Sequence, residues 1–203
     1  MKIYLLDSSA VMEDCWNAYF SNEPDVTVVC DNLAHFLDTI EVDCVVSPAN
    51  SYGLMDGGFD LALSEYFGWN LQERVQEYIV KHFKGEQPVA TSFIIDTFIR
   101  DIKLIHTPTM RRPFAIKDPM IVYQCTRTSL MCALENNMES IVIPAFCGEY
   151  GEVSPKVIAR LMYEAYKQII NPPSHIDWDY AERWFPELQY SMESWKKQYE
   201  DKE

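Results

Sequence analysis

The sequence predicts an α/β fold in which a central sheet is covered by helices on both faces. Three observations support this prediction. Short runs rich in Val and Ile alternate with segments of helical periodicity along the chain. The chain has 203 residues, 48% of them hydrophobic, so it can fill one sizeable core. Two of the apolar runs break directly into glycine-containing loops that precede helix starts, which is typical of α/β proteins.

The first half of the chain opens with an apolar strand, KIYLLD, followed by a helix that ends at the SNEPD turn. The next strand, VTVVC, precedes a short helix or helical turn, and the third strand, VDCVVS, leads into the first glycine loop. Two helices then flank the Gly68 break, and two further β runs follow them. The predicted strands are 2–7, 26–30, 42–47, 89–96 and 102–106, and the predicted helices are 10–20, 33–40, 60–67 and 70–83.

The second half begins with a loop, HTPTMRRP, that its prolines make rigid. Asp118 is expected to cap a helix with Pro119 at its first position, and this helix runs to about residue 136. The strand predicted at 140–146 breaks into the second glycine loop, CGEYG. Ser154 and Pro155 then repeat the cap-and-proline pattern at the start of a helix that the NPP sequence ends.

From Ser174 onwards the composition changes. Trp178, Trp184, Phe185 and Trp195 stand among acidic residues and lysines. We therefore expect two parts: an α/β domain over residues 1–171, and an aromatic, acidic extension over residues 172–203. The extension is expected to form one or two helices that pack on the domain through their aromatic side chains.

The charge balance restricts the partners. With 17 basic and 31 acidic residues the net charge is −14, which argues against nucleic acids and anionic membranes as partners. Backbone donors and helix ends must then hold any anionic ligand. The early apolar run is too short for a signal peptide, so we expect a cytoplasmic location. Because the six cysteines include no CxxC pair, they are expected to be reduced thiols in apolar surroundings, and we expect neither a metal site nor a cofactor.

The first glycine loop lies in the segment VVSPANSYGLMDGGFD, residues 45–60. A strand ends here, a loop carrying Asn50 and the Gly57–Gly58 pair follows, and a helix begins at or near Asp60. Glycines allow close approach of an anion, and a helix start offers free N–H groups and a favourable dipole. The segment therefore predicts an anion site, although a plain tight turn between strand and helix would give the same pattern.

The two glycine loops suggest one joint site. In open α/β sheets, ligands bind beyond the carboxyl ends of adjacent strands. If the strands that end at Ser47 and Phe146 are neighbours, the loops 50–59 and 147–151 face each other across one cleft. A diphosphate would fit between them.

The segments PANSYGLMDGGFD, IHTP and IPAFCGEYG together resemble the macrodomain family, which binds ADP-ribose. The resemblance covers about residues 26–170 and implies a three-layer α/β/α sandwich with a mixed sheet. It implies that Asp31 reads the adenine amino group, that Asn50 reaches the distal ribose and that Tyr150 packs on this ribose. In the hydrolytic members an asparagine and an aspartate ten positions apart carry the chemistry, which here implies Asn50 and Asp60. The other ligand-binding residues implied are Asn32, Ser51, Gly57, Gly58, Phe59, Cys147, Gly148, Glu149 and Gly151.

The chain departs from the family pattern in four places. Asp56 precedes only two glycines, Cys147 replaces a common threonine, Glu149 adds a carboxylate beside the expected phosphate, and Ser47 replaces a frequent asparagine. The two extra acids would weaken binding of a diphosphate by about 1 kcal/mol each, unless their side chains point outward.

The expected chemistry is cleavage at the anomeric carbon of the distal ribose, through an oxocarbenium-like state. Asn50 is suited to orienting ribose hydroxyls, since its amide both donates and accepts. Asp60 would accept a proton from water or act as a stabilising anion. At a helix N-terminus it is expected to stay ionised and to be a weak base, so a substrate phosphate would assist.

Each candidate also has a structural alternative. Asp31 and Asp60 would serve as caps, Asn50 would satisfy loop backbone groups, Tyr150 would be ordinary packing, and Cys147 is favoured as a structural thiol over a nucleophile. His106 is favoured as a core histidine, and the arginines at 111 and 112 as solvated.

Two functional classes follow: an enzyme that removes or hydrolyses an ADP-ribosyl group, and a module that captures ADP-ribose or a related NAD-derived nucleotide without turnover. Binding of RNA or poly(ADP-ribose) is a weaker third, because the composition is acidic.

Overall fold

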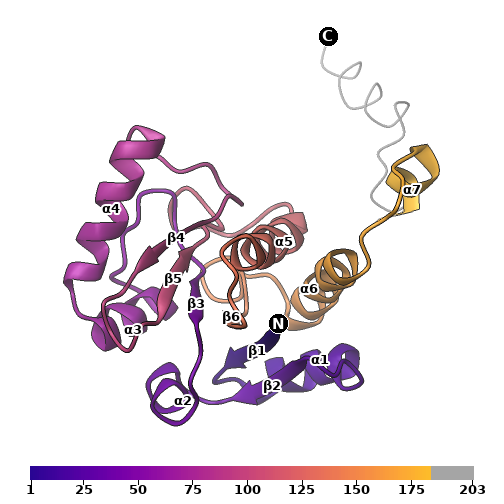
Figure 1. Cartoon of the computed structure of the whole chain (residues 1–203), viewed down its shortest axis with the longest axis horizontal. Coiled ribbons are helices and arrows are strands. Elements are labelled where there is room, and N and C mark those ends of the chain that lie inside the picture. The colour runs from indigo at the N-terminus through magenta and orange to yellow at the C-terminus, as the bar shows by residue number, and fades with distance from the viewer. Residues whose placement is uncertain (184–203) are drawn as a thin grey trace. The chain divides into compact units, whose positions relative to one another are not determined.

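The computed structural model of the chain describes residues 1–183. Its centre is a six-stranded sheet in the order β2-β1-β6-β3-β5-β4 (Figure 1). Neighbouring strands run parallel except at one edge, where β4 is antiparallel to β5. The strands are β1 (Lys2–Asp7), β2 (Val26–Cys30), β3 (Cys44–Ser47), β4 (Phe93–Asp96), β5 (Lys103–His106) and β6 (Ser140–Pro144). The sheet is mixed, as expected from the family resemblance.

Helices cover both faces of this sheet. Figure 1 shows α2, α3 and α4 on one side and α1, α5 and α6 on the other, so the predicted three-layer α/β/α sandwich is confirmed. These helices are α1 (Ala10–Phe20), α2 (Leu33–Thr39), α3 (Gly58–Phe67), α4 (Asn70–Phe83), α5 (Met120–Glu135) and α6 (Pro155–Ile170).

Most predicted boundaries agree with the structure, and the differences have local causes. β4 begins at Phe93 rather than at residue 89, because a turn at Pro88–Thr91, with Ala90 at a φ of 60°, precedes it. α3 begins two residues before Asp60. At α5 the predicted cap and first helical residue are shifted by one: Pro119 is the N-cap and Met120 the first helical residue, whose amide donates to Asp118. α6 begins at Pro155, as predicted.

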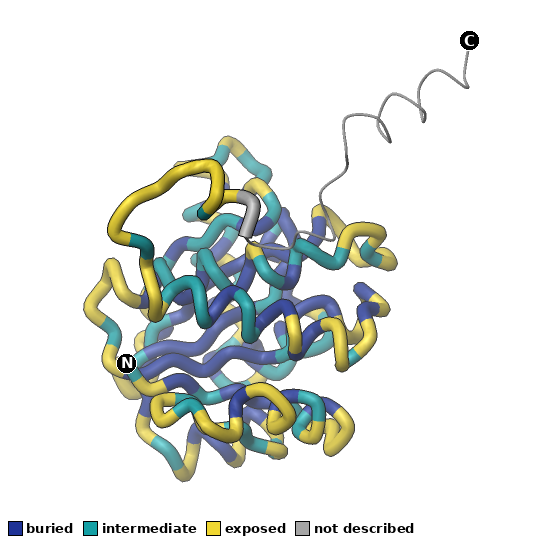
Figure 2. Tube along the Cα trace, turned by 90° about the vertical axis from the view of Figure 1, so that its right-hand side faces the viewer, coloured by how far each residue is buried: buried dark blue, intermediate teal, exposed yellow. Residues whose placement is uncertain are grey.

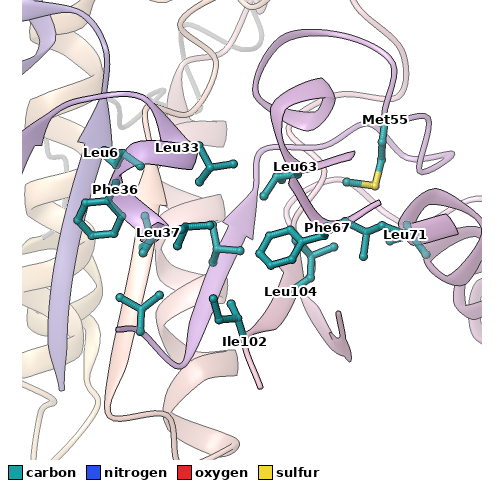
Figure 3. Packing of buried hydrophobic residues seen from close by; sticks show 14 of the residues in the cluster. Leu6, Leu33, Phe36, Leu37, Met55, Leu63, Phe67, Leu71, Ile102 and Leu104 are labelled. Atoms are coloured by element: carbon teal, nitrogen blue, oxygen red, sulfur yellow. The ribbon is translucent and has the colours of Figure 1, made fainter. Parts of the chain in front are cut away.

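The core lies between the sheet and its two helical layers. Figure 2 shows buried segments through the middle of the molecule and exposed residues on the outer turns. On one face, apolar side chains of α2, α3 and α4 pack against the strands in a single cluster, part of which Figure 3 shows. On the other face, Trp16 of α1 is fully buried, and its indole N–H donates to the sulfur of Met162 on α6. Four of the six cysteines are buried, whereas Cys30 is exposed, and no disulfide occurs among residues 1–183.

The order of the strands in the sheet brings the two glycine loops together. β3 pairs directly with β6 in parallel, with Val45 opposite Val142, so the strands that lead into the two glycine loops are neighbours, as the joint-site prediction required. β1 lies on the other side of β6, and β2 lies beside β1. The carboxyl ends of these four parallel strands share one edge of the sheet, where each continues into a helix.

Residues Met1–Ile170 form one compact unit, and the chain from Asn171 onwards belongs to a second one. The described part of the second unit contains the short helix α7 (Trp178–Arg183). The predictions for Trp184, Phe185 and Trp195 lie outside the described residues. Within residues 1–183, no helix has both the length and the apolar character needed to cross a membrane.

Candidate functional site

A cavity of about 900 Å³ opens at the carboxyl edge of β1, β2, β3 and β6. The loops after these four strands line it, together with part of the loop after β5 that includes Thr109 and Pro113. The structure thus brings the two predicted glycine loops into one cleft. The predicted site residues that line this cavity are Asp31, Asn32, Asn50, Gly57, Gly58, Phe59, Asp60, Cys147, Gly148, Glu149, Tyr150 and Gly151.

Ser51 is the one predicted site residue outside this cavity. It is fully buried, its amide donates to the carbonyl of Met110, and its own carbonyl accepts from the amide of Gln87. Ser51 therefore fastens the loop after β3 to the chain behind it. The sequence around Ser51 could not distinguish this structural role from contact with a ligand.

Asn50 is largely buried at the cavity wall, and its side chain organises its own loop. The amide Nδ2 donates to the carbonyl of Leu54 at 2.7 Å, and Oδ1 accepts from the amides of Tyr52 and Leu54. The structural role considered for Asn50, satisfying loop backbone groups, is thus realised. An amide nitrogen carries two hydrogens, so a second one remains for a ligand in the cavity.

The start of α3 supplies backbone donors. No side chain caps this helix, whose N-cap is Gly57, so its first turn leaves N–H groups without intrahelical partners. Gly58 has a positive φ of 55°, and a Cβ added to it would lie 2.5 Å from Oε2 of Glu149. The positive φ favours glycine here, and the absence of a side chain leaves room for the carboxylate of Glu149 from the opposite loop.

Asp60 is the third residue of α3 and is largely buried, with an exposed fraction of 7%. Its Oδ1 accepts a 2.6 Å hydrogen bond from the hydroxyl of Ser47, the last residue of β3. Burial raises the pKa of Asp60 to about 7; the hydrogen bond from Ser47 opposes this rise, and the negative charge of Asp56 adds to it. The expectation of an ionised, weakly basic Asp60 was therefore wrong, because desolvation outweighs the helix dipole.

The second glycine loop folds back sharply on itself. A Cβ at Gly151 would lie 2.5 Å from the carbonyl oxygen of Cys147, so only glycine fits. Cys147 adopts a positive φ of 64°, and its side chain is almost fully buried. Burial raises the pKa of its thiol to about 12, which leaves it protonated at neutral pH and supports a structural role for this cysteine.

Glu149 and Tyr150 reach across the cleft to the first glycine loop. Oε2 of Glu149 lies next to Gly58, and the hydroxyl of Tyr150 would lie 3.2 Å from a Cβ at Gly57. The sequence left open whether the two extra acids point outward. The carboxylate of Glu149 does not, since it lies against the loop expected to hold phosphate.

The other end of the cavity is formed by Asp31 and Asn32. Asn32 caps α2, with Oδ1 accepting from the amide of His35 at 2.9 Å. The carboxylate of Asp31 accepts from the ring Nδ1 of His35 at 2.5 Å. This hydrogen bond lowers the pKa of Asp31 and raises the pKa of His35. Sequence reasoning missed His35, although its position four residues after Asp31, at the start of a helix, was a usable signal.

The electrostatics of the cavity are unusual for an anion site. Among residues 1–183, the lining contains no lysine, arginine or histidine, whereas five carboxyl groups line it: Asp7, Asp31, Asp56, Asp60 and Glu149. Four helices begin at its wall, namely α1, α2, α3 and α6. Their N-termini offer partial positive charge and free N–H groups. An anion would therefore be held by backbone, as the charge balance predicted.

Two further predictions concern residues near the site. His106 is fully buried, donates from Nδ1 to Gln87 at 2.6 Å and stacks on Phe93, which confirms a core histidine; burial lowers its pKa to about 3. Arg111 is exposed, as expected for a solvated arginine, and it also forms an ion pair with Glu86 and donates to the hydroxyl of Tyr52. That pairing could not be seen in the sequence, because 25 residues separate Arg111 from Glu86.

Two curated proteins have sequences similar to most of this chain. A protein of Aquifex aeolicus is 28% identical over 145 residues, which cover 71% of this chain and 82% of that protein. A protein of Sulfolobus acidocaldarius is 30% identical over 132 residues, which cover 62% of this chain and 70% of that protein. Both are described as uncharacterised.

Solved structures share the fold. The macrodomain of Mycobacterium tuberculosis DarG superimposes with a TM-score of 0.57 at 17% identity, covering 68% of this chain and 88% of that one. A mutant of the Oceanobacillus iheyensis macrodomain, solved with ADPR, has a TM-score of 0.57 at 20% identity and covers 64% and 71% of the two chains. The same macrodomain solved with ADP gives 0.56 at 21% identity, covering 63% and 68%.

Residues 46–162 match the family described as Macro domain. This match spans more than half of the chain and includes both glycine loops. The chain therefore belongs to the macro domain family.

Proposed function

We propose that the cleft binds ADP-ribose or a derivative and that the protein hydrolyses an ADP-ribosyl bond. The observation that carries the proposal is the position of Asp60: a buried carboxyl group with a pKa of about 7 lines the same cavity as the two backbone loops suited to a diphosphate. Solved structures of the Oceanobacillus iheyensis macrodomain with ADPR and with ADP support the choice of ligand.

The binding part of the proposal uses the loops on either side of the cleft. The N–H groups at the start of α3 face the diphosphate together with the loop 147–151, and the dipole of the helix favours its charge. Asp31 accepts from the adenine amino group at one end. Tyr150 and Asn50 border the distal ribose at the other end, where the remaining N–H of Asn50 donates to a ribose hydroxyl.

The chemical part needs a water molecule, a leaving group and a proton acceptor. Water attacks the anomeric carbon of the distal ribose, the bond to the leaving group breaks, and a C–OH bond forms. Asp60 accepts the proton of the attacking water and passes it to the leaving group. A general base with a pKa near 7 is well matched to neutral pH, so Asp60 does not need the help of a substrate phosphate that its helix position suggested. The substrate is an ADP-ribosylated protein or a small derivative such as O-acetyl-ADP-ribose or ADP-ribose 1″-phosphate.

A capture module without turnover is the second candidate function. Two observations favour it: the side chain of Asn50 is engaged by its own loop, and the carboxylate of Glu149 lies against the first glycine loop. Both would reduce the groups available to orient a reacting ribose. Binding without release of ADP-ribose would establish this alternative.

The test is calorimetry with ADP-ribose, followed in the same sample by measurement of ADP-ribose released from an ADP-ribosylated protein. Asp60→Ala is expected to lower release by about 100-fold or more, because a general base contributes that much, while the Kd for ADP-ribose changes by less than about threefold. Asp118→Ala is the matched control, since this aspartate lies outside the cavity. Release that is unchanged in Asp60→Ala would remove Asp60 from the mechanism, and absence of binding would refute the whole proposal.

A further inference from the structure

Ser47 and Asp60 form a buried contact between the end of β3 and the first turn of α3. The hydroxyl of Ser47 donates to Oδ1 of Asp60 at 2.6 Å, and the serine is completely buried. The glycine loop lies between these two residues in the chain. The hydrogen bond therefore joins the two ends of the loop that forms one wall of the cleft.

The serine is fixed by the sheet. Its carbonyl accepts from the amide of Thr107 at 3.1 Å, and its neighbour across the ladder is His106 on β5. A hydroxyl on such a rigid strand holds the carboxyl group in one orientation. Oδ2 of Asp60 accepts no hydrogen bond from residues 1–183, and Asp60 lines the cavity. This second oxygen is thus available on the side from which a ligand approaches.

The charged groups near Asp60 are carboxyl groups, and the charge of Asp56 opposes its ionisation. Asp56 lies in the loop before α3, and Glu149 approaches Gly58 from the loop after β6. The helices α2 and α4 contact α3 and share one apolar cluster with it, which includes Leu37 and Leu71 (Figure 3). Within the described part of the chain, no lysine, arginine or histidine lines the cavity. Among the described side chains around Asp60, the hydroxyl of Ser47 is therefore the group that favours the carboxylate over the carboxylic acid.

We propose that Ser47 is the positioning residue for Asp60: its hydroxyl holds Oδ1 and turns Oδ2 towards the distal ribose. The same hydrogen bond favours the ionised form of the carboxyl group. This inference rests on the proposed hydrolytic function for its effect on turnover, but its effect on Asp60 exists without any ligand. Ser47 itself touches neither substrate nor the reacting atoms.

The first experiment is an NMR titration of the Asp60 carboxyl carbon in full-length, ¹³C-aspartate-labelled protein, with Asp60→Asn to assign the signal. Loss of the hydroxyl in Ser47→Ala is expected to raise the pKa of Asp60 by about 1 unit, because a hydrogen bond to a charged group contributes on that order. Ser47→Thr retains the hydroxyl and is expected to restore the wild-type titration. A pKa that is unchanged in Ser47→Ala would overturn the inference.

The second experiment measures release of ADP-ribose as a function of pH. Since the ionised form of Asp60 is the active one, the rising limb of the profile in Ser47→Ala is expected to move to higher pH by the same amount. Turnover would then fall about tenfold on the acid side and recover in alkaline buffer, with the Kd for ADP-ribose within about threefold of wild type. A loss of turnover that is equal at every pH would contradict the assignment.

Ser64→Ala is the matched control. Ser64 is also a fully buried serine, it lies one turn further along α3, and its hydroxyl donates to the carbonyl of Met55 instead of to a carboxyl group. This variant is expected to leave both the titration and the pH profile unchanged. The same shift in Ser64→Ala would show a general loosening of α3 and would overturn the role of Ser47. If the wild type releases no ADP-ribose while the titration shift is present, the hydrolytic function fails and the role of Ser47 in the ionisation of Asp60 stands.

Discussion

Asp60 is subject to two opposing influences on the charge of a carboxyl group. Its place in the first turn of α3 favours the anion, typically by about 0.3–1 kcal/mol. Its burial favours the neutral acid by more, since removing a carboxylate from water costs several kcal/mol. The pKa of about 7 shows that burial prevails. At the scale of single residues, solvent exposure therefore decides what this aspartate can do.

The raised pKa predicts how stability depends on pH. The folded protein binds the proton of Asp60 more tightly than the unfolded chain, in which an aspartate has its ordinary pKa of 3.8. The contribution of Asp60 to the free energy of unfolding is therefore fully present below about pH 4 and is lost as the pH rises to about 7, by roughly 4 kcal/mol for three pKa units.

Asp60→Asn removes this ionisation and keeps the shape of the side chain. The variant is expected to be more stable than the wild type at about pH 8, by roughly 2–4 kcal/mol, and to lose this advantage at about pH 4. Urea unfolding at the two pH values measures the difference. Asp14→Asn, at an exposed position on α1, is the control and should show no such pH-dependent gain. An equal effect of Asp60→Asn at both pH values would mean that Asp60 does not titrate between them.

At the scale of elements, the loop after β3 is held by the loop after β5. The amide of Ala49 donates to the carbonyl of Thr107, and the amide of Thr109 donates back to the carbonyl of Ala49. Arg111 extends this connection through its ion pair with Glu86 and its hydrogen bond to the hydroxyl of Tyr52. The backbone around Asn50 is thus fixed by a segment that lies more than fifty residues later in the chain.

Arg111→Ala is expected to weaken binding of ADP-ribose by about threefold to tenfold, because the Asn50 loop loses part of its support and must be ordered by the ligand. The free energy of unfolding should change by less than about 1 kcal/mol, since the ion pair is exposed to solvent. Calorimetry measures the affinity, and hydrogen exchange of the loop amides should become faster. Arg112→Ala, at the adjacent exposed arginine, should change neither. Unchanged hydrogen exchange in Arg111→Ala would show that the backbone bonds alone hold the loop.

At the scale of the whole molecule, an anionic ligand meets a protein of net charge −14 and a cavity lined by five carboxyl groups. The long-range field repels the ligand, while the helix N-termini attract it only at short range. Added salt screens the long-range repulsion before it screens the short-range attraction, because the Debye length falls from about 30 Å at 0.01 M to about 8 Å at 0.15 M.

Affinity for ADP-ribose is therefore expected to increase, by about threefold or more, when NaCl is raised from about 10 to about 150 mM, the reverse of what a site built from lysines and arginines shows. Titration calorimetry across this range measures it, with neutral adenosine as the control ligand. Glu149→Gln should raise the affinity by about fivefold at low salt and flatten the dependence, because it removes one charge at the first glycine loop. A decrease of affinity with salt in the wild type would contradict this account of the site.

The sequence by itself determined the order of strands and helices, the family and the two glycine loops. These features are local: apolar periodicity, proline and glycine positions and the spacing of Asn50 from Asp60 can all be read within short windows. Only the tertiary structure decided the burial, the ionisation and the contacts of the site residues. The burial of Asp60, which raises its pKa, arises from the packing around it. Contacts between segments that are separate in the chain give the hydrogen bond from Ser47, the approach of Glu149 to Gly58 and the pairing of Arg111 with Glu86. Electrostatic energies depend on distance and solvent exposure, and no local pattern of residues encodes either of these.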